Sequence, residues 1–166
     1  MLKKSFVCIL LSTFLLLPTM VQAFGIVSGS LSFKPPNSPI LPAGWVRILL
    51  ARTPAQIPDL PDLKKLNAQQ RMETIRNLHM NFFLSVRQNM SDPTFIVQSG
   101  LSTPEGAFAF PDVPAGNYYL IVTFPAMVKD YKVAWQVPVS VKDNETSLVV
   151  LNNDNLLLPT YSRKKP

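Results

Sequence analysis

Short runs in which apolar and polar residues alternate recur along the chain, and they predict β-strands. Proline and glycine clusters, which end strands and favour turns, separate these runs. Pro138 falls inside one run and has no N–H to donate, so that strand is expected at a sheet edge or a bulge. Seven closely spaced strands joined by turns are typical of a β-sandwich. The predicted strands are 25–33, 45–51, 95–98, 107–110, 117–124, 131–140 and 147–151.

One segment between the second and third predicted strands has a different period. From Leu63 to Leu78, apolar residues return at spacings of about three, with polar residues between them. This pattern predicts a helix over residues 62–80, with Asp62 or Asn67 as the capping residue. The chain is therefore expected to be mainly β, with one helical insertion at about 59–92.

The end of this insertion allows two interpretations. Residues 81–88 contain no glycine or proline and can extend the helix. They can equally form a short strand that places Phe82, Leu84 and Val86 on one face. The pattern alone leaves both alternatives open.

The beginning of the chain resembles an export signal. Two lysines precede residues 6–17, which are almost wholly apolar, and Val21-Gln22-Ala23 supplies small residues where signal peptidase needs them. As a helix, this run spans about 18 Å, well short of the roughly 30 Å hydrocarbon core of a bilayer. Residues 1–23 are therefore predicted to be a cleaved signal peptide, with the mature chain starting near Phe24 and not inserted in a membrane. A short leader that starts with lysines favours a bacterial host, and so the periplasm or the extracellular space.

Composition adds limits on domain count and chemistry. The only cysteine, Cys8, lies in the predicted signal peptide, so residues 24–160 are expected to fold as one domain without disulfides. The formal net charge of +6 falls to about +1 when the two leading lysines and the basic cluster of the predicted tail, residues 161–166, are set aside. The remaining charges are scattered, which argues against nucleic acid as a partner.

Residues 102–120 carry a specific pattern. A Thr-x-x-Gly turn precedes a Phe-x-Phe strand, and Val-Pro-x-Gly-x-Tyr-x-Leu follows. The two phenylalanines share one face at period two, and the glycines suit tight turns. The residues that make the pattern are Gly106, Phe108, Phe110, Pro114, Gly116 and Tyr118.

This pattern resembles the carboxypeptidase regulatory-like family. Its members share a transthyretin-like β-sandwich, which is also described as a carbohydrate-binding-like fold. The resemblance implies a non-catalytic module, often found in exported or envelope proteins. The insertion at about 52–92 departs from the family, which usually has a short connection there.

Few residues suggest chemistry. His79 is the only histidine, and it lies in the predicted helix without a nucleophile elbow nearby, so it is expected to be a structural or surface residue. One histidine and no cysteine after the signal peptide argue against a zinc site, and no cofactor is expected. Asn89 and Asn144 begin glycosylation sequons, which matter only in a host that glycosylates exported proteins.

Aromatic side chains are the candidates for ligand contact. Trp45, Tyr119 and Trp135 could stack on a sugar ring, although the two tryptophans lie in predicted strands, where such rings more often belong to a core. Tyr118 and Tyr119 are neighbours in a strand and must point to opposite faces. At most one of these two tyrosines is therefore expected on the surface.

These observations favour an exported, non-catalytic binding or structural module. Its expected partner is another envelope or secreted protein, met through a sheet edge or through the insertion. The alternative is a carbohydrate-binding module with a polysaccharide partner. An enzyme of an unrecognised kind is the third hypothesis, and a pocket that joins His79 to acidic residues would favour it.

Overall fold

The computed structural model of the 166-residue chain describes residues 24–162. The predicted signal peptide and residues 163–166 lie outside this described part. Within it, seven strands have five or more residues, as the sequence predicts. They are β1 (Phe24–Phe33), β3 (Arg47–Ala51), β4 (Ile96–Leu101), β5 (Ala107–Pro114), β6 (Gly116–Val122), β9 (Trp135–Val141) and β10 (Thr146–Leu151).

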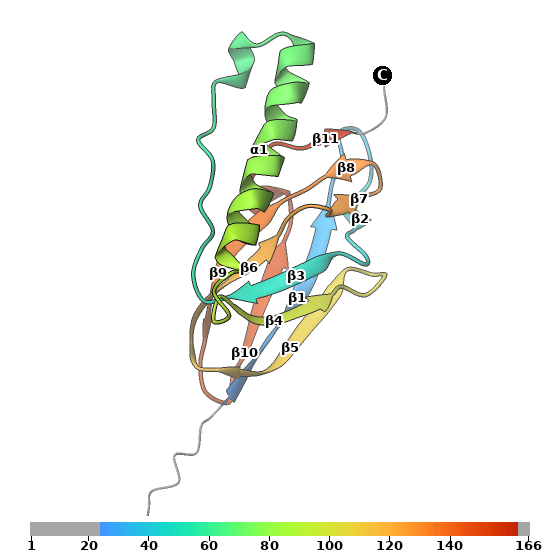
Figure 1. Cartoon of the computed structure of the whole chain (residues 1–166). Coiled ribbons are helices and arrows are strands. Elements are labelled where there is room, and N and C mark those ends of the chain that lie inside the picture. Colours follow the sequence, from blue (N-terminus) through green and yellow to red (C-terminus); the bar gives the residue numbers. More distant parts are fainter. Residues whose placement is uncertain (1–23, 163–166) are drawn as a thin grey trace, which may run out of the picture.

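Short elements complete the order (Figure 1). The strand predicted over 131–140 is interrupted before Trp135, which separates a two-residue strand from β9. Residues 161 and 162, assigned to the tail from sequence, pair with that two-residue strand and so belong to the fold. The short elements are β2 (Leu41–Pro42), β7 (Met127–Val128), β8 (Tyr131–Lys132), β11 (Tyr161–Ser162) and the 3₁₀ turns η1 (Leu63–Lys65) and η2 (Asn153–Asn155).

The longer strands form two sheets that make a sandwich. In the first sheet, β1 pairs in parallel with β10 and antiparallel with β5, and β2 adds to its end. The second sheet has the antiparallel order β4-β3-β6-β9. Pro138 lies in β9 at the edge of this sheet, which confirms the expected edge position.

The main core lies between the two sheets. Val27 and Leu31 of β1 and the Phe-x-Phe pair of β5 point inward from the first sheet, and Ile48, Leu50 and Leu120 meet them from the second. This alternation is the period-two pattern of the sequence realised in space. Burying each such side chain contributes about 1.5–3 kcal/mol to stability.

The helix α1 (Ala68–Asn89) begins later and ends later than predicted. Asn67 caps it: the Asn67 side chain accepts from the Gln70 backbone N–H at 2.9 Å, and the Gln70 side chain accepts from the Asn67 N–H at 3.1 Å. The extended backbone at Leu66 and Asn67 separates the helix from η1, so the predicted start near 62 is too early and Asn67, one of the two predicted caps, begins α1.

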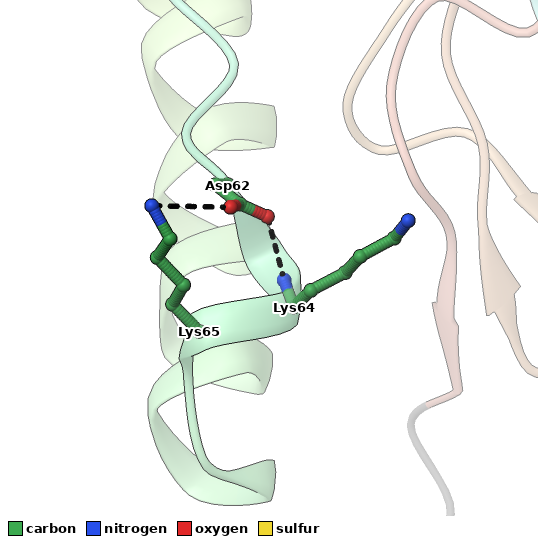
Figure 2. Close-up of polar contacts among 3 residues, drawn as sticks. All are labelled: Asp62, Lys64 and Lys65. Atoms are coloured by element: carbon green, nitrogen blue, oxygen red, sulfur yellow. Dashed lines mark hydrogen bonds and ion pairs between the residues drawn. The ribbon is translucent and has the colours of Figure 1, made fainter.

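Asp62 caps the preceding 3₁₀ turn η1. Figure 2 shows its carboxylate accepting from the Lys64 backbone N–H at 3.1 Å and pairing with the Lys65 ammonium at 3.5 Å. Both candidate capping residues therefore cap, but they cap different elements. Aligned N–H groups at a helix start are satisfied by such side chains, which is why each element begins where it does.

The uncertain stretch 81–88 is helix rather than strand. Phe82 and Val86, four residues apart, lie on the buried face of α1 and pack on the outer face of the second sheet. There they form a second core with Leu78 of the helix and Leu49 and Ile121 of the sheet. The helical insertion is therefore docked, and its first turns and η1 extend beyond the strands (Figure 1).

Candidate functional site

A groove of about 640 Å³ opens where the second half of α1 faces the start of β3 and the loop between β6 and β7. The floor of the groove is continuous with the protein core, since Leu49 and Val86 belong to both. The lining residues are Trp45, Val46, Arg47, Leu49, Phe83, Val86, Arg87, Met90, Leu101, Thr123, Phe124, Pro125, Ala126 and Met127.

Large apolar side chains on the rim of this groove are exposed to solvent. Trp45 is 69% exposed, Leu101 57% and Met90 52%, although they come from three separate segments of the chain. Single exposed apolar residues are ordinary on protein surfaces, whereas a group of them around a concave apolar site is typical of interaction surfaces.

Trp45 is held outward by its backbone. Its φ of +59° is in the left-handed region, which costs a non-glycine residue about 1–3 kcal/mol unless its surroundings enforce it. The buried Ser102 does so: its hydroxyl accepts from the Val46 N–H at 3.0 Å and donates to the Ala43 carbonyl at 2.6 Å. In addition, the Trp45 N–H donates to the Ser102 carbonyl at 3.2 Å. The indole is thus displayed by a fixed turn.

An aromatic pair forms one wall of the groove. The rings of Phe83, on α1, and Phe124, on the loop after β6, lie 5.3 Å apart. The ammonium of Lys132 lies 4.1 Å from the centroid of the Phe124 ring and donates to the Pro125 carbonyl at 3.4 Å. A cation over the ring face and an aromatic neighbour both restrain Phe124. The aromatic wall of the groove is therefore held in one arrangement.

The charged residues that line the groove are both positive. Arg47 comes from β3 and Arg87 from the last turn of α1, and no aspartate or glutamate belongs to the lining. Among residues 24–162, neither guanidinium has a hydrogen bond or an ion pair. The groove thus combines apolar walls with two uncompensated positive charges.

Thr123, one of the residues that line the groove, has a buried side-chain oxygen without a hydrogen-bond partner among residues 24–162. Its Oγ1 is covered from solvent and makes no hydrogen bond in the described part of the chain. A buried hydroxyl without a hydrogen bond costs about 1–3 kcal/mol. The groove lining therefore contains a destabilising unpaired hydroxyl that the packing of the β-sandwich does not explain.

The residues of the family-like pattern form turns and pack in the core. Gly106, with φ of +83°, ends the Thr103–Gly106 turn, where a Cβ would overlap the Leu31 carbonyl oxygen. Phe108 and Phe110 are buried side by side, with ring centroids 5.9 Å apart. Downstream, Gly116 packs against the ring of Tyr118, which is buried and donates its hydroxyl to the Pro114 carbonyl at 2.8 Å.

The structure does not gather the three aromatics considered for ligand contact. Trp45 is on the groove rim and in a turn, so the expectation that it lies in a strand and a core is corrected. Tyr119 is half-buried and packs against the second core beneath α1, on the face opposite Tyr118. Trp135 is fully buried, and its Nε1–H donates to the Asn152 carbonyl at 2.8 Å, so its ring has no face free for a ligand. This burial is the physical reason to set Trp135 aside as a surface contact.

His79 has a structural environment on the buried face of α1. Its Nε2 lies 2.8 Å from the Pro159 carbonyl oxygen, and its ring meets the edge of Tyr161 at 5.6 Å. Burial lowers the pKa of His79 below 6.5, with the nearby Lys132 adding to this effect and the Pro159 bond opposing it. These contacts join the helix to residues 159–161 and are in keeping with the structural role expected of His79.

Residues 24–162 contain no group of three or more histidine, cysteine, aspartate or glutamate side chains able to hold a metal ion. Nor does any helix in this range have the length and apolarity to span a membrane. A second hollow of about 610 Å³, between residues 33–37 and 153–160, is more open to solvent than the groove.

Most of the groove residues were not found by sequence reasoning. Phe83, Arg87 and Met90 recur at spacings of four and three, and this period would have placed them on one helix face if 81–88 had been assigned to the helix. Arg47 and Leu101, in contrast, have no local signal. Their place in the groove depends on the pairing of β3 with β4, which puts them opposite one another.

Comparison with family models and with curated proteins gives no match for this chain. Solved structures with distant similarity include three bacterial proteins. A Pseudomonas aeruginosa protein described as a candidate carbohydrate binding protein aligns over 79% of this chain and 89% of its own, with 15% identity and a TM-score of 0.44.

The other two are pilins. The minor pilin GBS52 of Streptococcus agalactiae aligns over 87% of this chain and 49% of its own, with 12% identity and a TM-score of 0.46. The major pilin subunit of Bacillus cereus aligns over 81% of this chain and 30% of its own, with 13% identity and a TM-score of 0.40. This chain therefore matches half or less of each pilin. Similarity at this distance carries nothing about ligands or partners.

Proposed function

We propose that this chain is a non-catalytic binding module of the cell envelope or exterior, whose groove holds a segment of another exported protein. The observation that carries this proposal is the ring of exposed apolar side chains around a groove built on two packed cores. Trp45, Met90 and Leu101 leave apolar surface in water, and burying it against a partner would be favourable.

The form of the groove supports a peptide-like partner. Its volume of about 640 Å³ and its apolar walls are of the kind that take a short run of side chains. Hydrophobic grooves of this general kind take up a peptide through a few apolar anchor side chains. Because both walls are tied to the core, little ordering is needed on binding, which favours affinity.

Site-specific crosslinking in the native host tests this proposal. A photoreactive residue replaces Met90, at the groove, and in a matched control it replaces Leu148, which is 79% exposed on β10 of the other sheet. We expect a discrete protein adduct from position 90, weakened when Trp45 is changed to alanine, and no such adduct from position 148. Adducts that are absent at position 90, or equal at both positions, would contradict the proposal.

A second candidate function is carbohydrate binding, because of one observation. The Trp45 ring is displayed by a fixed turn two residues from Arg47, and an indole face beside a guanidinium can stack on a sugar and donate to its hydroxyls. Tyr119 and Trp135 do not join it in a platform, which places this candidate second. Glycan-array binding that Trp45→Ala abolishes and Trp45→Phe retains would favour it over the protein partner.

A further inference from the structure

We propose that the segment held by the groove is acidic as well as apolar, with carboxylates that meet Arg47 and Arg87. This inference rests on the proposed function and names the chemistry of the partner. The observation behind it is the charge of the groove lining, which has two positively charged side chains and no negatively charged one, and which is surrounded by an apolar rim.

The two arginines stand on different elements. Arg47 is at the first position of β3, and Arg87 is in the last turn of α1, so the groove is charged from both the sheet and the helix. A cation near a helix C-terminus is stabilised by the helix dipole, which accounts in part for Arg87. That explanation does not extend to Arg47, which is on a strand.

Within residues 24–162, no carboxylate pairs with either arginine. The acid that follows most closely after Arg87 in the sequence is Asp92, and its carboxylate is engaged in its own turn. It accepts from the Thr94 N–H at 2.8 Å and from the Thr94 hydroxyl at 2.7 Å. Two ion pairs between described residues join Asp62 to Lys65 and Lys142 to Glu145, and none of these four residues lines the groove.

Arginine beside apolar surface selects for carboxylate. The planar guanidinium donates two parallel hydrogen bonds to a carboxylate, and it is less strongly hydrated than an ammonium, so it can pair where water is partly excluded. A neutral apolar segment would bring no partner to the two guanidiniums, and a basic one would be repelled. An extended or helical segment with acidic residues flanking apolar anchors satisfies both features of the groove.

The test uses a phage-displayed library of random peptides selected on the purified chain. Peptides that bind wild type are counter-selected on a rim variant, Met90→Ser with Leu101→Ser, so that only groove-dependent peptides remain. Both positions are exposed, and the variant is expected to fold. The affinity of synthetic copies is then measured with Arg47→Gln and Arg87→Gln, alone and together, and with Arg76→Gln, an exposed arginine of α1 outside the groove, as the matched control.

The expected result is enrichment of aspartate and glutamate among apolar residues in the recovered peptides. Each groove arginine change should weaken binding by about fivefold to tenfold, and Arg76→Gln should leave it unchanged. Replacing the peptide carboxylates with amides should cause the same loss on wild type and no further loss on the double arginine variant. Binding should also weaken as salt is raised.

Two other results separate the inference from the proposed function. If groove-dependent peptides are neutral or basic, or keep their affinity on the double arginine variant, the inference that the bound segment is acidic is refuted. The proposal that the groove binds a protein segment is then still supported. If no recovered peptide depends on Met90 and Leu101, the peptide-binding groove is refuted and the inference fails with it.

Discussion

At the residue scale, two side chains show how the groove departs from what a bare sandwich needs. Ser102 uses both hydrogen-bonding capacities of its buried hydroxyl to hold the turn that displays Trp45. Thr123, which also lines the groove, leaves its hydroxyl without a hydrogen bond among residues 24–162. A fold selected for stability alone would favour neither an exposed indole in a left-handed conformation nor an unpaired buried oxygen.

The Thr123 hydroxyl leads to a stability prediction. Thr123→Val keeps the shape of the side chain and removes the unpaired oxygen, so we expect the free energy of unfolding to rise by about 1 kcal/mol. Urea denaturation followed by tryptophan fluorescence measures this change. As a control, Ser102→Ala removes a hydroxyl that is fully bonded and should destabilise the fold. A loss of stability in Thr123→Val would mean that its hydroxyl is satisfied in solution.

At the scale of elements, the helical insertion is part of the fold and not an appendage. Phe82 and Val86 of α1 cover Leu49 and Ile121 on the outer face of the second sheet. Removing the insertion would expose this second core and promote aggregation. Binding experiments are therefore better made with point changes on the rim than with deletions.

The separate caps of η1 and α1 give a prediction at this scale. Asn67→Ala removes the side-chain acceptor that caps the Gln70 N–H at the start of a 22-residue helix, and we expect it to cost about 1 kcal/mol of stability. Asp62→Ala affects only the exposed three-residue turn drawn in Figure 2 and should cost less. Chemical denaturation of the two variants compares them. Equal losses would show that the two elements fold as one unit.

At the scale of the whole molecule, His79 joins the helix to the end of the described chain. Its imidazole bonds the Pro159 carbonyl and packs on Tyr161, whose strand β11 pairs with β8. The charge of Lys132, on β8, also lowers the pKa of His79. Protonating His79 would therefore place a buried positive charge near another cation.

This arrangement predicts how stability changes with pH. Because burial lowers the pKa of His79 in the folded state, the unfolded chain takes up its proton first as pH falls. The contribution of the neutral side chain is present above its unfolded pKa of 6.5 and is lost progressively as pH falls from 6.5 toward the lower folded value. Melting temperatures of wild type and His79→Gln measured across this range test the prediction. The variant should show a shallower loss, and parallel curves would assign the acid sensitivity to other groups.

Much of the architecture is a property of short stretches of sequence. The alternation in β1 and β5, the Phe108–Phe110 pair and the turn at Gly106 follow from side-chain period and backbone sterics, which act over a few residues. The existence of a helix in the insertion was predictable for the same reason. Its boundaries were less so, because Asp62 and Asn67 are both good caps and only the intervening extended backbone shows which begins α1.

The sequence by itself thus determined a mainly β sandwich with one helical insertion, because periodicity and turn chemistry are local. Only the tertiary structure decided that 81–88 is helix, since the outer face of the second sheet offers Phe82 and Val86 a place to be buried. It also decided that Trp45 is displayed while Trp135 is buried, and that Arg47 and Arg87, forty residues apart, share one groove. These outcomes depend on contacts between distant segments, which no local pattern encodes.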